Sequence, residues 1–85
     1  MNAGAGTIVD ARGLRCPLPV IRLAAAALGA APGARLTVLA TDPAAEHDVP
    51  AWARMRGHAV VGSEYDEAAG TWSLTVEVSG QVPAA

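Results

Sequence analysis

The chain has 85 residues, which is enough for one domain and leaves no room for a second hydrophobic core. Hydrophobic residues make up 52% of it, the net charge is −2 and lysine is absent, which argues against a protein that grips nucleic-acid phosphates. One cysteine, no signal-peptide pattern and no apolar run of about 20 residues lead us to expect a cytoplasmic protein without disulfides or membrane contact.

The first half of the chain predicts a strand, a helix and a second strand. We expect the strands at residues 7–10 and 35–40 and the helix at about residues 16–28, where prolines fit the first turn. Gly29 suits the end of this helix. The apolar residues at helical spacing, which we expect to face the core, are Leu18, Ile21, Ala25 and Leu28.

The next segment predicts a second helix with an interruption. Asp42-Pro43 is a typical helix start, but Pro50 removes a hydrogen bond and is expected to disturb the helix. We therefore expect one turn after Asp42 and then a main helix over residues 48–56, ended by Gly57. The residues expected to face inward are Val49, Trp52 and Ala53.

The last part predicts a hairpin, with strands at residues 58–64 and 71–78 joined by a loop at 65–70. Alternation in the final strand separates two faces. Trp72, Leu74, Val76 and Val78 are expected to point inward, and Thr71, Ser73, Thr75 and Glu77 outward.

The element order β-α-β-α-β-β predicts an α+β two-layer sandwich. We expect a four-stranded mixed sheet with both helices on one face. The domain is expected to span residues 7–79, with a disordered N-terminal tail at 1–6 and a loose C-terminal tail at 80–85.

Cys16 is the candidate functional residue because it lies at the junction of the first strand and the first helix. If Pro17 is the first helical residue, the N–H of Leu18 is the donor expected to point at the sulfur. Helix placement and Arg15 are expected to hold the pKa of Cys16 below its usual value of about 8.5. The alternative is an ordinary small buried side chain, which free cysteines often are.

The stretch Val9-Asp10-Ala11-Arg12-Gly13-Leu14-Arg15-Cys16-Pro17-Leu18-Pro19 resembles the signature of the TusA-like (SirA-like) sulfur-carrier family. Three later segments match that family in order and spacing, at residues 40–43, 48–50 and 57–58. The resemblance covers residues 7–79.

This resemblance implies that Cys16 carries sulfur as a persulfide, in the manner of a sulfurtransferase-type carrier, with no other cofactor. It implies a cysteine desulfurase or rhodanese-type donor protein and an acceptor protein, in a relay such as tRNA thiolation, sulfur oxidation or molybdenum-cofactor synthesis. Leu18 stands where the best-known members have an acidic residue, and Ala24 to Ala27 replace most of the expected basic residues. The residues expected to shape the cysteine loop are Gly13, Pro17, Leu18 and Pro19.

The single cysteine also predicts delivery across a protein interface, because the chain has no second cysteine to receive the sulfur. We expect Cys16 to be partly exposed for that reason. The expected contact is apolar, from Leu14 and Leu18, and is rimmed by Arg12, Arg15 and Arg22.

Two other functions remain open from the sequence. A one-cysteine redox protein is possible by thiolate chemistry, although no resolving cysteine is present. A small RNA-binding module is compatible with an α/β sandwich, although the acidic net charge opposes it. We expect no metal site, because His47 and His58 lack the close ligand spacing of zinc sites. Asp42 and Asp48 are interpreted as helix caps, and His58 as a cap of the helix-to-strand turn.

Overall fold

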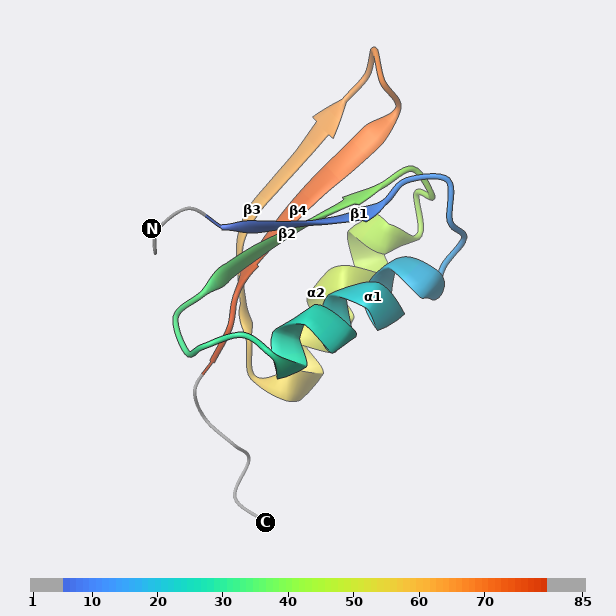
Figure 1. The fold of residues 1–85 in the computed structure, drawn as a ribbon. Helices are drawn as coiled ribbons and strands as arrows, with labels where there is room; N and C mark the ends of the chain where they lie inside the picture. The colour runs from blue at the N-terminus through green and yellow to red at the C-terminus, as the bar shows by residue number, and fades with distance from the viewer. Residues whose placement is uncertain (1–5, 80–85) are drawn as a thin grey trace.

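Alternating apolar residues build a sheet that is covered on one face by two helices (Figure 1). The computed structural model describes residues 6–79, so residues 1–5 of the tail predicted at 1–6, and the whole tail predicted at 80–85, lie outside the described residues. The elements are β1 (Thr7–Ala11), α1 (Leu18–Leu28), β2 (Arg35–Ala40), α2 (Ala45–Arg56), β3 (Ala59–Asp66) and β4 (Thr71–Glu77).

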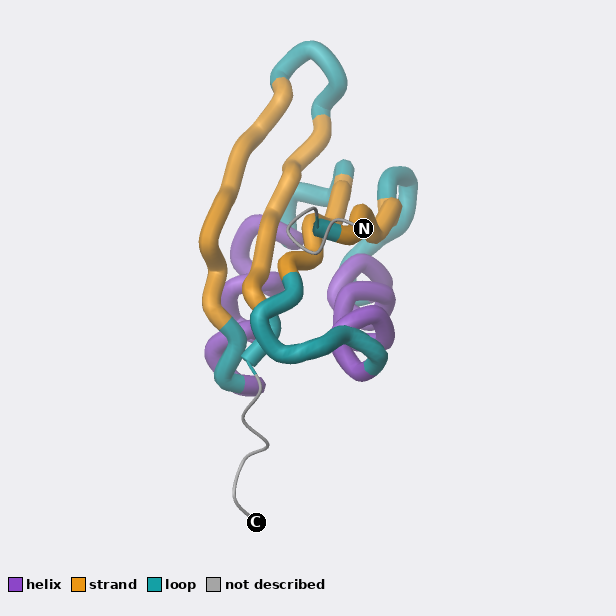
Figure 2. Tube along the Cα trace, turned by 60° about the vertical axis from the view of Figure 1, so that its left-hand side comes forward, coloured by secondary structure: helices purple, strands orange, loops and turns teal. Residues whose placement is uncertain are grey.

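The sheet has the strand order β1-β2-β4-β3. β1 is parallel to β2, and the other two pairings are antiparallel. Figure 2 shows both helices on the same side of the strands, with the β3–β4 hairpin extending beyond them. The predicted fold, a four-stranded mixed sheet with two helices on one face, is therefore confirmed. None of the helices described between residues 6 and 79 is long and apolar enough to cross a membrane.

The core lies between the helices and the central strands. Val38 on β2 and both Leu74 and Val76 on β4 are fully buried, and α1 and α2 contribute Leu23 and Val49. Burial of Leu74 and Val76 confirms the predicted register of β4, because a shift by one residue would have turned them to the other face.

The predicted apolar face of α1 is wrong. Leu18, Ile21 and Leu28 are 46%, 55% and 91% exposed, whereas Pro19 and Leu23 are buried. The physical reason is that α1 has one charged residue and four consecutive alanines, so that several of its faces are apolar. Helical spacing alone cannot tell which of these faces will meet the sheet.

The helix α2 is not interrupted as predicted. It runs without a break from Ala45 through Pro50, and the predicted break is therefore wrong. The proline removes only the hydrogen bond to the carbonyl of Glu46, while Val49 and Ala53 are buried as expected. Packing of this face against the sheet outweighs the local cost of the proline. Trp52 is partly buried against the core.

The hairpin differs from the prediction at its tip. β3 extends two residues further, to Asp66, whose carboxylate accepts hydrogen bonds from the N–H groups of Ala68 and Ala69. Thr71, expected to point outward, is buried, and its hydroxyl donates to the carbonyl of Ala69 at 3.1 Å. β3 is an edge strand that is exposed along nearly its whole length.

Candidate functional site

Cys16 lies in the loop that leads from β1 into α1, and its side chain is partly exposed, as predicted. In Figure 1 this loop lies beside the loop that leads from β2 into α2. The two loops are neighbours because β1 and β2 are parallel, so that both strands end at the same edge of the sheet. This topology brings residues near position 42 next to a cysteine that is 26 positions away in the sequence.

Two hydrogen bonds fasten the cysteine loop to the β2–α2 loop. The N–H of Gly13 donates to the hydroxyl of Thr41 at 2.8 Å, and the N–H of Cys16 donates to Oδ2 of Asp42 at 3.0 Å. The other oxygen of Asp42 accepts from the N–H of Ala44 at 2.9 Å. Gly13 has a φ of +83°, a conformation that favours glycine, which supports its predicted role in shaping the loop. Asp42 therefore does more than start a helix.

The start of α1 differs from the prediction. Pro17 is the N-cap, the first helical residue is Leu18, and the N–H of Leu18 donates to the carbonyl of Arg15 at 2.9 Å. The expected bond from Leu18 to the sulfur is therefore wrong. The peptide bond between Cys16 and Pro17 is cis. Cys16 itself stands outside the helix, so its thiol does not take the N-cap position in which the helix dipole would act on it most directly.

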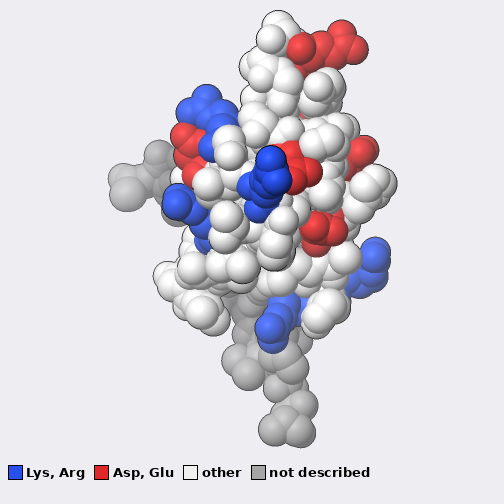
Figure 3. Space-filling view, turned by 90° about the vertical axis from the view of Figure 1, so that its right-hand side faces the viewer, with Lys and Arg blue, Asp and Glu red and all other residues white. Residues whose placement is uncertain are grey.

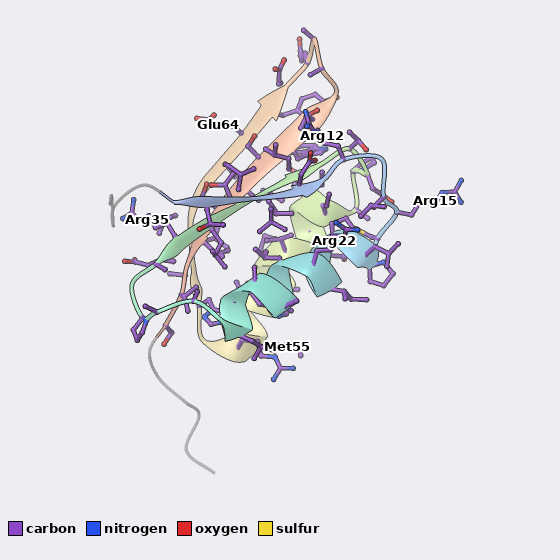
Figure 4. All side chains as sticks on the ribbon, in the orientation of Figure 1. Arg12, Arg15, Arg22, Arg35, Met55 and Glu64 are labelled. Atoms are coloured by element: carbon purple, nitrogen blue, oxygen red, sulfur yellow. The ribbon has the colours of Figure 1, made fainter. Side chains whose placement is uncertain are left out.

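The predicted lowering of the pKa of Cys16 is also wrong. Burial, the hydrogen bond between its thiol and Asp48, and the negative charges of Asp42 and Asp48 raise the pKa of Cys16 to about 11. Both carboxylates favour the neutral thiol over the thiolate because like charges repel. Hydrogen bonds from the N–H groups of Ala44 and Cys16 lower the pKa of Asp42, and the charge of Arg15 adds to this effect. Figure 4 shows the Arg15 side chain extending away from the loop into solvent.

The other two arginines of the predicted rim gather around a different residue. Arg12 forms an ion pair with Asp10 at 2.7 Å, and its hydrogen bonds lower the pKa of Asp10 to about 2. The charge of Arg22 lowers the pKa of Asp10 further. Figure 4 shows Arg12, Arg15 and Arg22 pointing in different directions. The three side chains are therefore not assembled around the thiol, and Figure 3 shows blue and red groups mixed on this end of the molecule.

An apolar groove adjoins the cysteine loop. It has a volume of about 310 Å³ between α1 and α2 and begins at Pro17, next to Cys16. Asp48 is the one charged residue in its lining, which consists of Pro17, Val20, Asp48, Ala51, Trp52 and Met55. Of the two leucines predicted to make a partner contact, Leu18 is exposed near this groove, whereas Leu14 is packed partly against the core.

The two histidines lie away from any metal-like cluster. The side chain of His47 is 83% exposed, and Nδ1 of His58 accepts a hydrogen bond from the N–H of Ser79 at 3.0 Å. The ring of His58 also lies 5.0 Å from that of Trp52, measured between ring centroids. Across residues 6–79, no group of three or more potential ligands is placed to hold a metal ion.

Sequence reasoning missed the roles of three residues at this site. Thr41 and Asp42 hold the cysteine loop, and Asp48 lies beside this loop and helps to raise the pKa of Cys16. Their signal was present in the segments at 40–43 and 48–50 that match the family pattern. The local sequence predicts only helix caps at Asp42 and Asp48, because nothing in it shows that the two loops meet.

Comparisons with known proteins agree with this architecture of a small sandwich with a thiol at a strand–helix junction. The family model described as "Sulfurtransferase TusA" matches residues 7–78. The sulfur carrier protein TusA of Pseudomonas aeruginosa is 42% identical over 72 residues, which cover 85% of this chain and 89% of that protein. The protein of the same name from Pseudomonas putida is 40% identical over 65 residues, covering 76% and 79%.

A solved structure is also similar. The crystal structure of the SirA-like protein from Desulfitobacterium hafniense superposes with a TM-score of 0.69 at 31% identity, covering 86% of this chain and 97% of that one. The fold and the site thus define a small thiol-bearing α/β sandwich. The chain belongs to the TusA family of sulfur carriers.

Proposed function

We propose that this protein accepts sulfane sulfur on Cys16 as a persulfide and transfers it to an acceptor protein. The observation that carries the proposal is the placement of the chain's one cysteine, partly exposed on a loop that hydrogen bonds hold in place. Family membership supplies the chemistry, since the relatives are named sulfur carriers. The relay is expected to run among cytoplasmic proteins.

Each half of the transfer is an exchange between sulfur atoms. In loading, Sγ of Cys16 loses its proton and attacks the outer sulfur of a donor persulfide. A new S–S bond forms, and the donor's own cysteine leaves as a thiolate. In delivery, a thiolate of the acceptor attacks the outer sulfur now held on Cys16. The bond from Cys16 to that sulfur breaks, the electron pair stays on Sγ, and no net oxidation occurs.

The two other functions considered from the sequence receive less support. Redox-sensing cysteines are typically exposed and have a lowered pKa, whereas the pKa of Cys16 is raised. A nucleic-acid surface needs clustered positive charge, but acidic and basic groups are mixed on the end of the molecule that carries the cysteine loop (Figure 3).

The test is mass spectrometry of the protein after incubation with a cysteine desulfurase and cysteine. We expect an added mass of one sulfur on Cys16, and labelled sulfur should then pass to an acceptor. Cys16→Ser should abolish loading and leave the fold intact. Normal passage of labelled sulfur through Cys16→Ser would refute the proposal.

A second variant tests whether the cysteine loop meets the partners. Arg15→Glu should slow loading or delivery without unfolding the protein, because Arg15 extends from that loop. Arg35→Glu is the matched control, since it makes the same charge change at an exposed position at the far end of the molecule. Equal rates for both variants would place the partner contact elsewhere.

A further inference from the structure

Asp48 is an acidic residue beside the cysteine loop. It stands in the first two turns of α2 and lines the groove that begins at Pro17, the residue after Cys16. Its carboxylate is one of the groups that raise the pKa of the Cys16 thiol. Asp42 approaches from the β2–α2 loop and holds the backbone N–H of Cys16 at 3.0 Å. Two carboxylates from two other segments thus lie close to one cysteine.

The surroundings strengthen the effect of Asp48. It is the one charged residue lining the groove between α1 and α2, and the other lining residues are apolar. In apolar surroundings a charge is screened less than in water, so its action on a neighbouring group is larger. Apart from burial, the groups that raise the pKa of Cys16 are the two carboxylates, whereas the charge of the nearby Arg15 acts on Asp42.

We propose that Asp48 is a positioning and specificity-determining residue for sulfur transfer. From its place in the apolar groove beside Pro17, its carboxylate favours reaction partners that bring a positive charge next to their reacting sulfur. This inference rests on the proposed function for its biological meaning. A lysine or arginine beside the donor's persulfide would pair with Asp48, weaken its hold on the thiol proton and allow Sγ to attack.

The proton of the thiol has to leave before the sulfur is loaded. In the resting protein it sits on Sγ, because burial and the nearby carboxylates raise the pKa of Cys16. As Sγ forms its bond to the outer sulfur of the donor, the proton passes from Sγ to a base, which is either the Asp48 carboxylate or water. When the acceptor later takes the sulfur, Sγ recovers a proton and the neutral resting thiol returns.

The first test follows the alkylation rate of Cys16 by iodoacetamide as a function of pH. Asp48→Asn removes the charge but preserves the shape and one acceptor oxygen, so its midpoint should fall relative to the wild type. At pH 7 each pKa unit of that fall gives about ten times more thiolate. Each thiolate is then about threefold less nucleophilic, so the alkylation rate should rise about three- to fourfold per unit. Glu46→Gln is the matched control, because it removes a charge from the same end of α2 without touching the thiol.

The second test measures the preference for charge with three small disulfides. Cystamine is cationic, hydroxyethyl disulfide is neutral and dithiodipropionate is anionic. The rate of each with Asp48→Asn is divided by its rate with the wild type, which cancels the intrinsic reactivity of the reagent. We expect this ratio to be lowest for cystamine and highest for dithiodipropionate, and Asp48→Glu should restore most of the wild-type preference.

The outcomes separate the two proposals. An unchanged midpoint in Asp48→Asn, with normal thermal unfolding, would overturn the role of Asp48 even if the wild type loads persulfide normally. A lowered midpoint with equal ratios for all three disulfides would overturn the preference for cationic partners. Absence of persulfide on the wild type would refute the proposed function and leave the alkylation result standing, because alkylation needs no sulfur donor.

Discussion

Replacing Asp42 with alanine tests whether this residue holds the cysteine loop. Asp42 accepts two backbone hydrogen bonds, from Cys16 at 3.0 Å and from Ala44 at 2.9 Å. Because the side chain is partly exposed, each bond is worth about 1 kcal/mol, and Asp42→Ala should cost about 2 kcal/mol of unfolding free energy. For a domain of this size that corresponds to a fall in Tm of about 8–16 °C.

The assay pairs thermal unfolding with the alkylation rate of Cys16 at neutral pH. Asp42→Ala should raise this rate, since it frees the loop and removes one of the charges that raise the pKa of Cys16. Asp66→Ala is the matched control, because Asp66 also accepts two backbone N–H groups but lies at the tip of the β3–β4 hairpin. The control should leave the alkylation rate unchanged.

A Tm of Asp42→Ala within about 2 °C of the wild type would contradict this role of Asp42, because the loss expected for two hydrogen bonds is much larger. Equal changes in the alkylation rate for Asp42→Ala and Asp66→Ala would also contradict it, because the effect would then not depend on contact with the cysteine loop.

Two further predictions concern packing and pH. Leu23→Ala should cost about 2–5 kcal/mol of unfolding free energy because Leu23 is fully buried. Leu28→Ala should change the unfolding free energy by less than about 0.5 kcal/mol because Leu28 is 91% exposed. Similar urea midpoints for the two variants would contradict the observed face of α1. As pH rises from about 9 to about 11, the wild type should lose stability relative to Cys16→Ser, because the cysteine ionises near 9.0 when unfolded and near 11 when folded. Urea unfolding of both proteins at pH 8 and pH 11 measures this difference, and parallel curves would rule out the raised pKa.

The sequence predicted the fold well where one periodicity was clear. The strict alternation in β4 identified Leu74 and Val76 as core residues, and the order of elements gave the sandwich. The face of α1 could not be predicted in the same way, because its alanines make most of its surface apolar. The continuity of α2 through Pro50 could not be predicted either, because tertiary packing decides it and the local effect of a proline does not.

The site was predicted in part. The position of Cys16 at a strand–helix junction and its partial exposure followed from the motif around it. Its electrostatics did not follow, because Arg15 is adjacent in sequence but points into solvent, whereas Asp42 and Asp48 are distant in sequence but close in the fold. A pKa depends on distances in space, and local sequence gives only the distances along the chain.

The hydrogen bonds from Thr41 and Asp42 to the cysteine loop bear on protein engineering. A designer who moves only residues 11–19 onto another sandwich would transfer the thiol and its prolines but leave the N–H groups of Gly13 and Cys16 without their acceptors. Residues 40–48 have to travel with them, on a parallel neighbouring strand, for the loop to keep its shape. The transplantable unit is therefore a pair of strand ends, and it can be installed only in a sheet whose first two strands run in the same direction.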